Sequence, residues 1–288
     1  MLRLAVATDA ETLDRIAGPL AERGIEARYV PTTGRAQPLS EPLVEEGFDA
    51  GFVYPSRVME GGVADALLGV PWVNGRTAVL RSRNKADTLA RLERAGVPTP
   101  ESVYVSNPAA DSELRAAFER LEAPVVVKPN STTRGVGIAR ADDLDSFFGI
   151  CEYLSLVHDY RAVDDRSFLV QEFLPDARDV RVMVGGGEYA GAVERRLPAA
   201  ERAAGRWKHN VHRGAVAEGV DLAPERRELA ETAADVLGIE WLGVDLLVAD
   251  GRTVVNETNA RPTVDSATKY DPDFYDRLAG LIRRTADD

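Results

Sequence analysis

The sequence predicts a protein of mixed α/β and α+β class that is built from three units. Up to about residue 80, apolar segments alternate with helical segments, which is typical of a parallel sheet. Later in the chain, paired strand segments are joined by short glycine turns, which indicates antiparallel hairpins. The 288 residues exceed the size of one compact domain. We therefore expect an N-terminal αβ domain (1–84), a small α+β lid unit (85–170) and a C-terminal, mainly antiparallel α+β unit (171–288).

The first unit begins with the apolar segment LRLAVA, which predicts a strand. A helix at 11–23 follows and stops at Gly24, because glycine is a common helix terminator. The other apolar segments of this unit are short and are separated by turn residues. Strands are expected at 2–7, 26–30, 48–54 and 71–74.

The small unit opens with the segment NKADTLARLERA (84–95), which predicts a helix. Leu89 and Leu92 lie three residues apart on one face, and Gly96 and Pro98 end the helix. A strand, a glycine-bearing loop and an apolar exit are then expected within 123–139. The remaining elements of this unit are helices at 110–121 and 142–158 and a strand at 168–174.

The third unit contains the clearest hairpin of the sequence. The segments DVRVMV (179–184) and YAGAVERR (189–196) are joined by a turn at Gly185–Gly187, which favours a tight antiparallel connection. A second hairpin is expected around an Asp-Gly turn at 250–251. The other elements are a helix at 224–237, strands at 243–249 and 253–259, and a terminal helix near 272–285.

The composition excludes several classes of protein. A net charge of −12 argues against a nucleic-acid binder, because contacts to nucleic-acid phosphates need a basic face. No apolar stretch reaches the roughly 18 residues of a membrane-spanning helix, and the N-terminus lacks the features of a signal peptide. The single cysteine, Cys151, cannot form an intramolecular disulfide. We expect a cytoplasmic protein in which Cys151 is a small buried helix residue rather than a nucleophile.

Lysine is rare in this chain. Four of the 35 basic residues are lysines, and the rest are arginines. An acidic surface with few lysines is consistent with a halophilic host whose cytoplasm is rich in salt. A GC-rich genome, which favours arginine codons, would produce the same bias. The four lysines are Lys85, Lys128, Lys208 and Lys269.

Lys128 marks the first candidate site. It ends the apolar segment VVVK and is followed by a loop, 130–137, that contains Gly135 and Gly137. A lysine at the end of a buried strand is costly unless it meets an anion, and glycines let backbone N–H groups approach phosphate closely. A mobile turn with an exposed lysine fits the pattern equally well. A Walker phosphate loop does not fit, because no Gly-Lys-Ser/Thr follows.

Two carboxylates, Asp245 and Glu257, lie on strands joined by a tight turn, and Asn259 follows on the second strand. Glu257 and Asn259 are two residues apart and so face the same side. Apolar neighbours indicate burial, and two buried acids side by side would repel each other unless a cation lies between them. Oxygen ligands of this kind suit Mg²⁺, with Mn²⁺ as an alternative. A solvated hairpin face that carries harmless acids is the other interpretation.

The third candidate group is basic and lies on the first hairpin and in the segment WKHNVHRG (207–214). Guanidinium groups fit carboxylate and phosphoryl oxygens, so this density of cations in an acidic chain indicates an anion pocket. A surface network with neighbouring glutamates is the alternative. Zinc is not expected at the two histidines, because no cysteine or third histidine lies nearby. The group comprises Arg181, Arg195, Arg196, Lys208, His212 and Arg213.

These residues belong to motifs that follow one another along the chain: Lys85, VVVKP with its glycine loop, VQEF, DVR, ERR, KHNVHRG, GVDLL and NETN. The order resembles that of the ATP-grasp ligases. The likeness is closest to the RimK-type glutamate ligases, and the glutathione synthetases are more distant. It covers about residues 70–262. The segment 80–102 is similar to the lysine-bearing helix and linker of the family, and WKHNVHRGA (207–215) to a substrate loop of the RimK branch.

The resemblance implies an ATP-grasp fold with ATP and Mg²⁺ bound between the small unit and the C-terminal unit. The residues implied to bind ATP are Lys85, Lys128, Gly135, Gly137, Gln171, Glu172, Phe173, Leu174, Asp179 and Lys208. Those implied to hold the metal are Asp245, Glu257 and Asn259. Those implied to act in catalysis are Arg181, Arg195 and Asn210, and those implied to contact the substrate are Arg213 and Arg261.

The implied reaction joins a carboxylate to an amine through an acyl phosphate. The expected partners are a small-molecule or peptide carboxylate acceptor and an amino acid, most simply L-glutamate; a homo-oligomer is left open. Two alternatives remain at this point. The chain could be another ATP-grasp synthetase, of the glutathione, lysine-biosynthesis or D-alanine–D-alanine type. It could also be an ATP-binding protein without turnover.

Two segments depart from the RimK pattern. After Asn259 the family continues into a Pro-Gly turn, whereas this chain has Arg261–Thr263, which changes the substrate side more than the metal side. The loop 130–137 is also more polar than the small-residue loop of the family. We expect Arg134 in this loop to add a donor toward the γ-phosphate.

Overall fold

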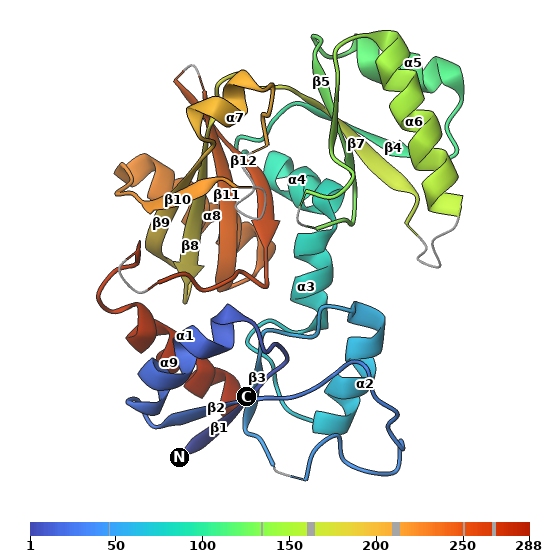
Figure 1. Ribbon diagram of the computed structural model, residues 1–288. Coiled ribbons are helices and arrows are strands. Elements are labelled where there is room, and N and C mark those ends of the chain that lie inside the picture. The colour runs from blue at the N-terminus through green and yellow to red at the C-terminus, as the bar shows by residue number, and fades with distance from the viewer. Residues whose placement is uncertain (46, 134, 160–164, 209–213, 250, 267–268) are drawn as a thin grey trace.

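The computed structural model describes residues 1–288 except 46, 134, 160–164, 209–213, 250 and 267–268. The described residues form three sheets with helices packed against them (Figure 1). Helices α3 (Arg76–Arg83) and α4 (Lys85–Arg94) lead from the N-terminal sheet to the region between the other two sheets. Among the described helices, none is both long enough and apolar enough to cross a membrane.

The N-terminal sheet is parallel, as the alternation of strands and helices predicts. Strand β1 lies between β2 and β3. The C-terminal helix, α9 (Phe274–Asp287), returns to this unit and packs against α1, where Leu278 and Ile282 share a core with Leu4 and Ile16. The elements are β1 (Leu2–Val6), α1 (Glu11–Ala21), β2 (Ile25–Tyr29), β3 (Ala50–Phe52) and α2 (Val58–Leu68).

Two strand predictions in this unit are corrected by the structure. Residues 71–74 do not form a strand. Their pairing with β3 is limited to one isolated parallel bridge, at Trp72. The Asn74 side chain instead donates to two backbone carbonyl oxygens of the C-terminal unit, at 2.6 and 2.7 Å. The strand expected at 48–54 is shortened to β3, because Val53 has a φ of 55°, which an extended strand does not allow.

The small sheet is antiparallel and has the strand order β4-β7-β5-β6. Two helices cover one face, and their apolar residues form a core with the strands that includes Phe147, Cys151 and Phe168. Cys151 is buried there as predicted, and burial raises the pKa of its thiol to about 12. The elements are β4 (Ser102–Ser106), α5 (Asp111–Glu119), β5 (Val125–Pro129), β6 (Ala139–Ala141), α6 (Leu144–Asp159) and β7 (Ser167–Glu172).

The third sheet has the order β10-β9-β8-β11-β12 and is antiparallel throughout. The predicted glycine hairpin is confirmed, and Gly186 and Gly187 form its turn with φ values of 67° and 85°. The elements are β8 (Arg178–Gly185), β9 (Glu188–Arg196), α7 (Ala199–Ala203), β10 (Val216–Gly219), α8 (Pro224–Leu237), β11 (Trp241–Ala249) and β12 (Arg252–Asn259).

The two faces of this sheet differ in character because side chains alternate along each strand. Val182 and Val244 point to the face that α8 covers and join its apolar core. The intervening positions on the same strands carry charged residues, among them Asp179, Arg181 and Asp245. The charged face is therefore left to form one wall of a cavity.

Candidate functional site

One large cavity lies where the small sheet, the charged face of the third sheet and the start of α1 meet. Its volume of about 1880 Å³ exceeds the roughly 300–1,000 Å³ of a pocket for one small ligand. The cavity can therefore hold a nucleotide together with a second molecule. The predicted site residues that line it are Lys85, Lys128, Gly135, Gln171, Glu172, Phe173, Leu174, Asp179, Arg181, Arg195, Lys208, Asp245, Glu257, Asn259 and Arg261.

Among the predicted site residues that the structure describes, Gly137 is not one of those that line the cavity. Gly137 has a φ of 77°, and a Cβ there would lie 2.8 Å from Pro129 Cγ. The loop thus requires glycine at this position for its own packing. Asn210 and Arg213 lie outside the described residues, as does Arg134.

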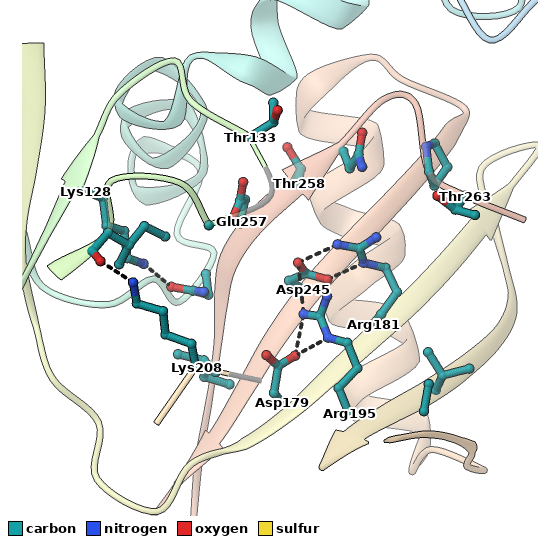
Figure 2. A pocket seen from close by; sticks show the side chains of 18 of the residues that line it. Lys128, Thr133, Asp179, Arg181, Arg195, Lys208, Asp245, Glu257, Thr258 and Thr263 are labelled. Carbon is teal, nitrogen blue, oxygen red and sulfur yellow. Dashed lines mark hydrogen bonds and ion pairs between the residues drawn. The ribbon is translucent and has the colours of Figure 1, made fainter. Parts of the chain in front are cut away.

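Asp245 lies at the centre of the charged face, where two arginines contact it (Figure 2). Arg181 donates to it from both Nε and Nη2, the latter at 2.7 Å. Arg195 Nη2 lies 3.1 Å from Asp245 Oδ2, and Arg195 Nε donates to Asp179 at 2.9 Å. Burial alone would raise the pKa of Asp245, but the two guanidinium groups outweigh it and hold this pKa at about 2. The carboxylate is therefore ionised at neutral pH.

Glu257 lies directly opposite Asp245 on the neighbouring strand, as the hairpin pattern predicts. A β-bulge shifts the register immediately after this pair and leaves Asn256 as the extra residue. Asn256 Oδ1 accepts a hydrogen bond from Lys128 Nζ at 2.7 Å, so the bulge links the two sheets. Sequence reasoning missed Asn256, although the polar run NETN interrupts the apolar strand at this point.

Two lysines face these carboxylates across the cavity. Lys85, at the start of α4, has its Nζ 3.6 Å from Glu257 Oε1 and donates to the carbonyl oxygens of Asn130, at 3.3 Å, and Thr132. Lys128 is buried on β5, and burial lowers its pKa to about 8; Glu257 opposes this shift and Lys85 adds to it. Both ammonium groups are held largely by neutral oxygens, so a polyanion would find two cations close together.

The end of β7 leads the chain along the cavity between the two sheets. Gln171 is buried there; its Oε1 accepts from Lys128, and its Nε2 donates to Ser102 Oγ at 2.9 Å. The strand ends at Glu172, two residues before the predicted end at 174. Phe173 and Leu174 therefore line the cavity from an irregular segment.

An aromatic contact joins this segment to the start of the predicted substrate loop. The rings of Phe173 and Trp207 lie edge to face, with centroids 5.8 Å apart. The Arg140 guanidinium lies 5.4 Å from the centre of the Phe173 ring. Lys208 Nζ donates to the carbonyl oxygen of Ile138 on the small-sheet side. Lys208, at the start of this loop, is thus attached to the small unit.

The donor set proposed for a metal consists of two carboxylates and one amide oxygen on adjacent strands. Asn259 Oδ1 accepts from Arg261 N at 2.8 Å, which fixes the amide orientation and leaves a second lone pair on the oxygen. Over the described part of the chain, no cluster of three or more His, Cys, Asp or Glu side chains could hold a metal ion. A hard cation that also binds phosphate oxygens fits such a small set. Asp245, Glu257 and Asn259 could therefore hold such a cation.

The N-terminal unit closes another part of the cavity, which the sequence did not predict. Thr8 and Thr12, at the start of α1, line the cavity. Arg15 Nη1 donates to the carbonyl oxygen of Val264 at 2.6 Å, although the two residues are 249 positions apart. Asp265 and Lys269 follow on the same segment and also line the cavity. No local pattern shows that these two segments meet.

Comparison with known sequences identifies relatives of this chain. A family model described as a RimK-like ATP-grasp domain matches residues 82–274. A probable alpha-L-glutamate ligase from Enterobacter sp. (strain 638) is 33% identical over 230 residues, which cover 76% of this chain and 70% of the relative. A probable alpha-L-glutamate ligase from Methanococcoides burtonii is 31% identical over 222 residues, with coverage of 75% and 67%.

Comparison with solved structures gives alignments over almost the whole chain. The RimK domain protein ATP-grasp from Sphaerobacter thermophilus aligns with a TM-score of 0.66 at 22% identity and covers 99% of this chain and 98% of that one. The D-alanine–D-alanine ligase from Bacillus anthracis complexed with ATP aligns with a TM-score of 0.70 at 17% identity, with coverage of 99% and 97%. At these identities the likeness is evidence for the fold alone.

Proposed function

Because this chain belongs to the RimK-like ATP-grasp family and has the ATP-grasp fold, we propose that it is an ATP-dependent ligase that joins a carboxylate to an amine. It forms an acyl phosphate and adds L-glutamate, or another amino acid, to the carboxylate of a peptide or cofactor. The observation that carries this proposal is the facing arrangement of charges. Lys85 and Lys128 lie on one wall of the cavity, and Asp245 and Glu257 lie on the other.

ATP is proposed to lie between the small sheet and the third sheet. The segment 171–174 borders the adenine, and Asp179 accepts hydrogen bonds from the ribose. Lys85 and Lys128 then meet the phosphates, because both lysines line this wall and are already buried. Charge-assisted hydrogen bonds to phosphate are stronger than those to the neutral oxygens that Lys128 contacts in the structure.

In the first step, a carboxylate oxygen of the acceptor attacks the γ-phosphorus of ATP. The bond from this phosphorus to the β,γ-bridging oxygen breaks, and ADP leaves with the electron pair. Arg195 and Arg181 lie on the charged face where this transfer would occur, and their fixed guanidinium groups offset negative charge that builds up at the reacting phosphoryl group. The product of this step is an acyl phosphate.

In the second step, the lone pair of the amine attacks the acyl carbon. The bond from this carbon to the phosphate oxygen breaks, inorganic phosphate leaves, and the nitrogen releases a proton to phosphate or solvent. Protein-bound intermediates are not required, which agrees with the position of Cys151 in the core of the small unit. Water must be kept from the acyl phosphate, and the loop 130–137 is the proposed lid.

Asp245, Glu257 and Asn259 are proposed to hold Mg²⁺, which when bound would offset the charge of the phosphate oxygens. Arg181 and Arg195 keep Asp245 ionised and fix its orientation. Glu257 is less enclosed, with 31% of its side chain exposed toward the cavity side. Its carboxylate is therefore the more accessible of the two for a cation that arrives with the nucleotide.

The test is an assay of ADP and phosphate release with ATP, Mg²⁺, single amino acids and cell extract, followed by mass spectrometry of the products. The expected result is ADP formation that depends on L-glutamate, together with an acceptor that has gained glutamyl groups. The matched control is Glu257→Gln, which keeps the shape of the side chain but removes a charged ligand, and which should lose most of the turnover.

Each alternative gives a different result in the same assay. ADP formation that depends on another amino acid would assign the chain to another type of ATP-grasp synthetase. ATP binding without ADP formation in any mixture would indicate an ATP-binding protein without turnover. Near-normal activity of Glu257→Gln would overturn the metal assignment.

A further inference from the structure

All four lysines of this chain line the cavity, although they are only four of its 35 basic residues. Lys85, Lys128 and Lys208 surround the proposed nucleotide site. Lys269 comes from the segment that also contributes Thr263, which Figure 2 shows on the opposite side of Asp245 from Lys128. Lysine is a compact point charge on a flexible stem, whereas arginine is a rigid fork. The proposed mode of ATP binding assigns no role to Lys269.

The backbone at Lys269 is firmly held. Its N–H donates to Ser266 O at 3.0 Å, and the next residue, Tyr270, stacks on Phe274 with ring centroids 4.2 Å apart. Tyr270 also forms a bridge to Gly191, where a Cβ would lie 2.8 Å from Lys269 O. A fixed backbone with a flexible side chain lets the ammonium group exchange partners without moving the segment.

The present partner of Lys269 is a carboxylate within the cavity. Lys269 Nζ lies 2.9 Å from Asp265 Oδ2, and Asp265 Oδ1 lies 3.7 Å from Arg15 Nη1. The Lys269 and Asp265 side chains are 22% and 28% exposed, so solvent in the cavity screens the pair and it contributes little to stability. The carboxylate of Asp265 thus lies beside two cations, Lys269 and Arg15. A carboxylate of a bound molecule could take the same position.

We propose that Lys269 is a specificity-determining residue that binds a non-reacting carboxylate of a substrate, in exchange for its contact with Asp265. This inference rests on the proposed function, in which both substrates are carboxylic acids. The reacting carboxylate lies beside the γ-phosphate near Arg195, so a second carboxylate must be placed elsewhere in the cavity. It belongs to the incoming amino acid or to a dicarboxylic acceptor, and Arg15 is the second cation within its reach.

A purely structural ion pair makes a different prediction for the two members of the pair. Lys269→Met and Asp265→Asn would then remove the same contact and have the same effect. If Lys269 binds a substrate, Lys269→Met lowers the affinity for that substrate. Asp265→Asn removes a competing charge and leaves this affinity unchanged or raises it. Lys269→Arg keeps the charge and should retain part of the affinity.

The experiment is calorimetric titration of the full chain, saturated with Mg²⁺ and a non-hydrolysable ATP analogue. The two probes are L-glutamate, as the amino acid, and glutarate, as a dicarboxylate without an amine. We expect Lys269→Met to lower the affinity for one of these probes by about 10- to 100-fold, which is the loss for one charge-assisted hydrogen bond. The affinity for the ATP analogue and the melting temperature should not change. The probe that responds identifies which substrate carries the carboxylate.

Three results would overturn the inference. One is that Lys269→Met binds each probe with the same affinity as the unchanged chain. Another is an equal loss in Lys269→Met and Asp265→Asn together with a lower melting temperature. The third is that the unchanged chain binds neither probe. Because calorimetry needs no turnover, a failure to form ADP would count against the proposed function and not against this inference.

Discussion

Asp245 and Lys128 are both buried charges of the cavity, but the fold compensates them in different ways. Asp245 has two guanidinium partners, which hold its pKa at about 2. Lys128 Nζ donates to the side-chain oxygens of Gln171 and Asn256, which are neutral, and burial lowers its pKa to about 8. A buried ammonium group without a close anionic partner is costly. Lys128 therefore gains more than Asp245 from a charged ligand of the opposite sign.

This difference makes ATP binding depend on pH. The pKa of Lys128 is about 8 in the free protein, against an ordinary 10.5, so the ammonium form predominates below pH 8 and the neutral amine above it. Phosphate favours the ammonium form, so ATP should raise this pKa and its binding should take up a proton near pH 8. ATP affinity should therefore fall as the pH rises from about 7 to 9. Calorimetry in two buffers with different ionisation enthalpies measures the proton uptake.

Lys128→Met is the control for this titration. It should weaken the binding of ATP by about 1.5–3 kcal/mol at pH 7, which is the range for a hydrogen bond to a charged group. It should also abolish the proton uptake. The same proton uptake in the variant would show that another group titrates.

Arg195 is expected to act on the reaction more than on ATP binding. Arg195→Ala should lower kcat more than it raises KM for ATP, because the charge that the guanidinium offsets develops in the transition state. It should also lower the free energy of unfolding by about 3 kcal/mol, because Asp179 and Asp245 lose a shared cation. Arg195→Lys should recover most of that stability but little of kcat, since lysine lacks the two-pronged geometry. Kinetics and urea unfolding of both variants separate the two effects. An Arg195→Ala enzyme with an unchanged kcat would move the reacting centre away from this face.

Among the elements, the sequence predicted those that carry their own signals. Helix α8 has the predicted bounds of 224–237, and the hairpin of β8 and β9 follows from its glycine turn. Helix α2 could not be predicted, because Gly61 and Gly62 lie within it and its apolar residues do not form a stripe. The bulge at Asn256 was also missed, because an extra residue in one strand is defined only by the register of its partner.

Gly191 on β9 tests how closely the segment of Lys269 approaches the third sheet. Its φ is 134°, and a Cβ would lie 2.8 Å from the backbone atoms Lys269 O and Tyr270 Cα. Gly191→Ala should therefore lower the free energy of unfolding by about 2–4 kcal/mol, through backbone strain and displacement of that segment. Gly187→Ala is the matched control, because Gly187 has a φ of 85° but no atom within 4 Å of the added Cβ. Urea unfolding measures both variants. If both variants lost the same free energy of unfolding, the segment of Lys269 would be shown to move away from the added methyl group without a measurable energetic penalty.

For the whole molecule, the sequence predicted two walls of the cavity and missed the third. Lys128 and Asp245 could be assigned to facing walls because the order of the motifs resembles that of the ATP-grasp ligases, which implies an ATP site between the small unit and the C-terminal unit. The wall formed by α1 and the segment from Val264 depends on a contact between residues 249 positions apart. Helix α9 holds these two parts of the chain together through the core of the N-terminal unit. Only the complete fold determines such a contact, so the substrate side was the least predictable part of the site.

The cavity draws residues from the small sheet, the third sheet and α4, so bound ATP should stabilise the whole chain. At an ATP concentration of about 100 times Kd, the stabilisation is about 2.7 kcal/mol, which corresponds to a rise in Tm of several degrees. The phosphates should supply most of it, because Lys85 and Lys128 come from different segments, both line the cavity, and lie close enough for Lys85 to lower the pKa of Lys128. Adenosine at the same concentration should therefore raise Tm much less than ATP with Mg²⁺. Lys128→Met should lose most of the ATP effect, whereas Lys269→Met, which changes a residue outside the proposed nucleotide site, should keep it. Thermal unfolding with each ligand gives the comparison. A rise with adenosine as large as that with ATP would show that the lysines do not contact the phosphates, and ATP would then have to be placed elsewhere in the cavity.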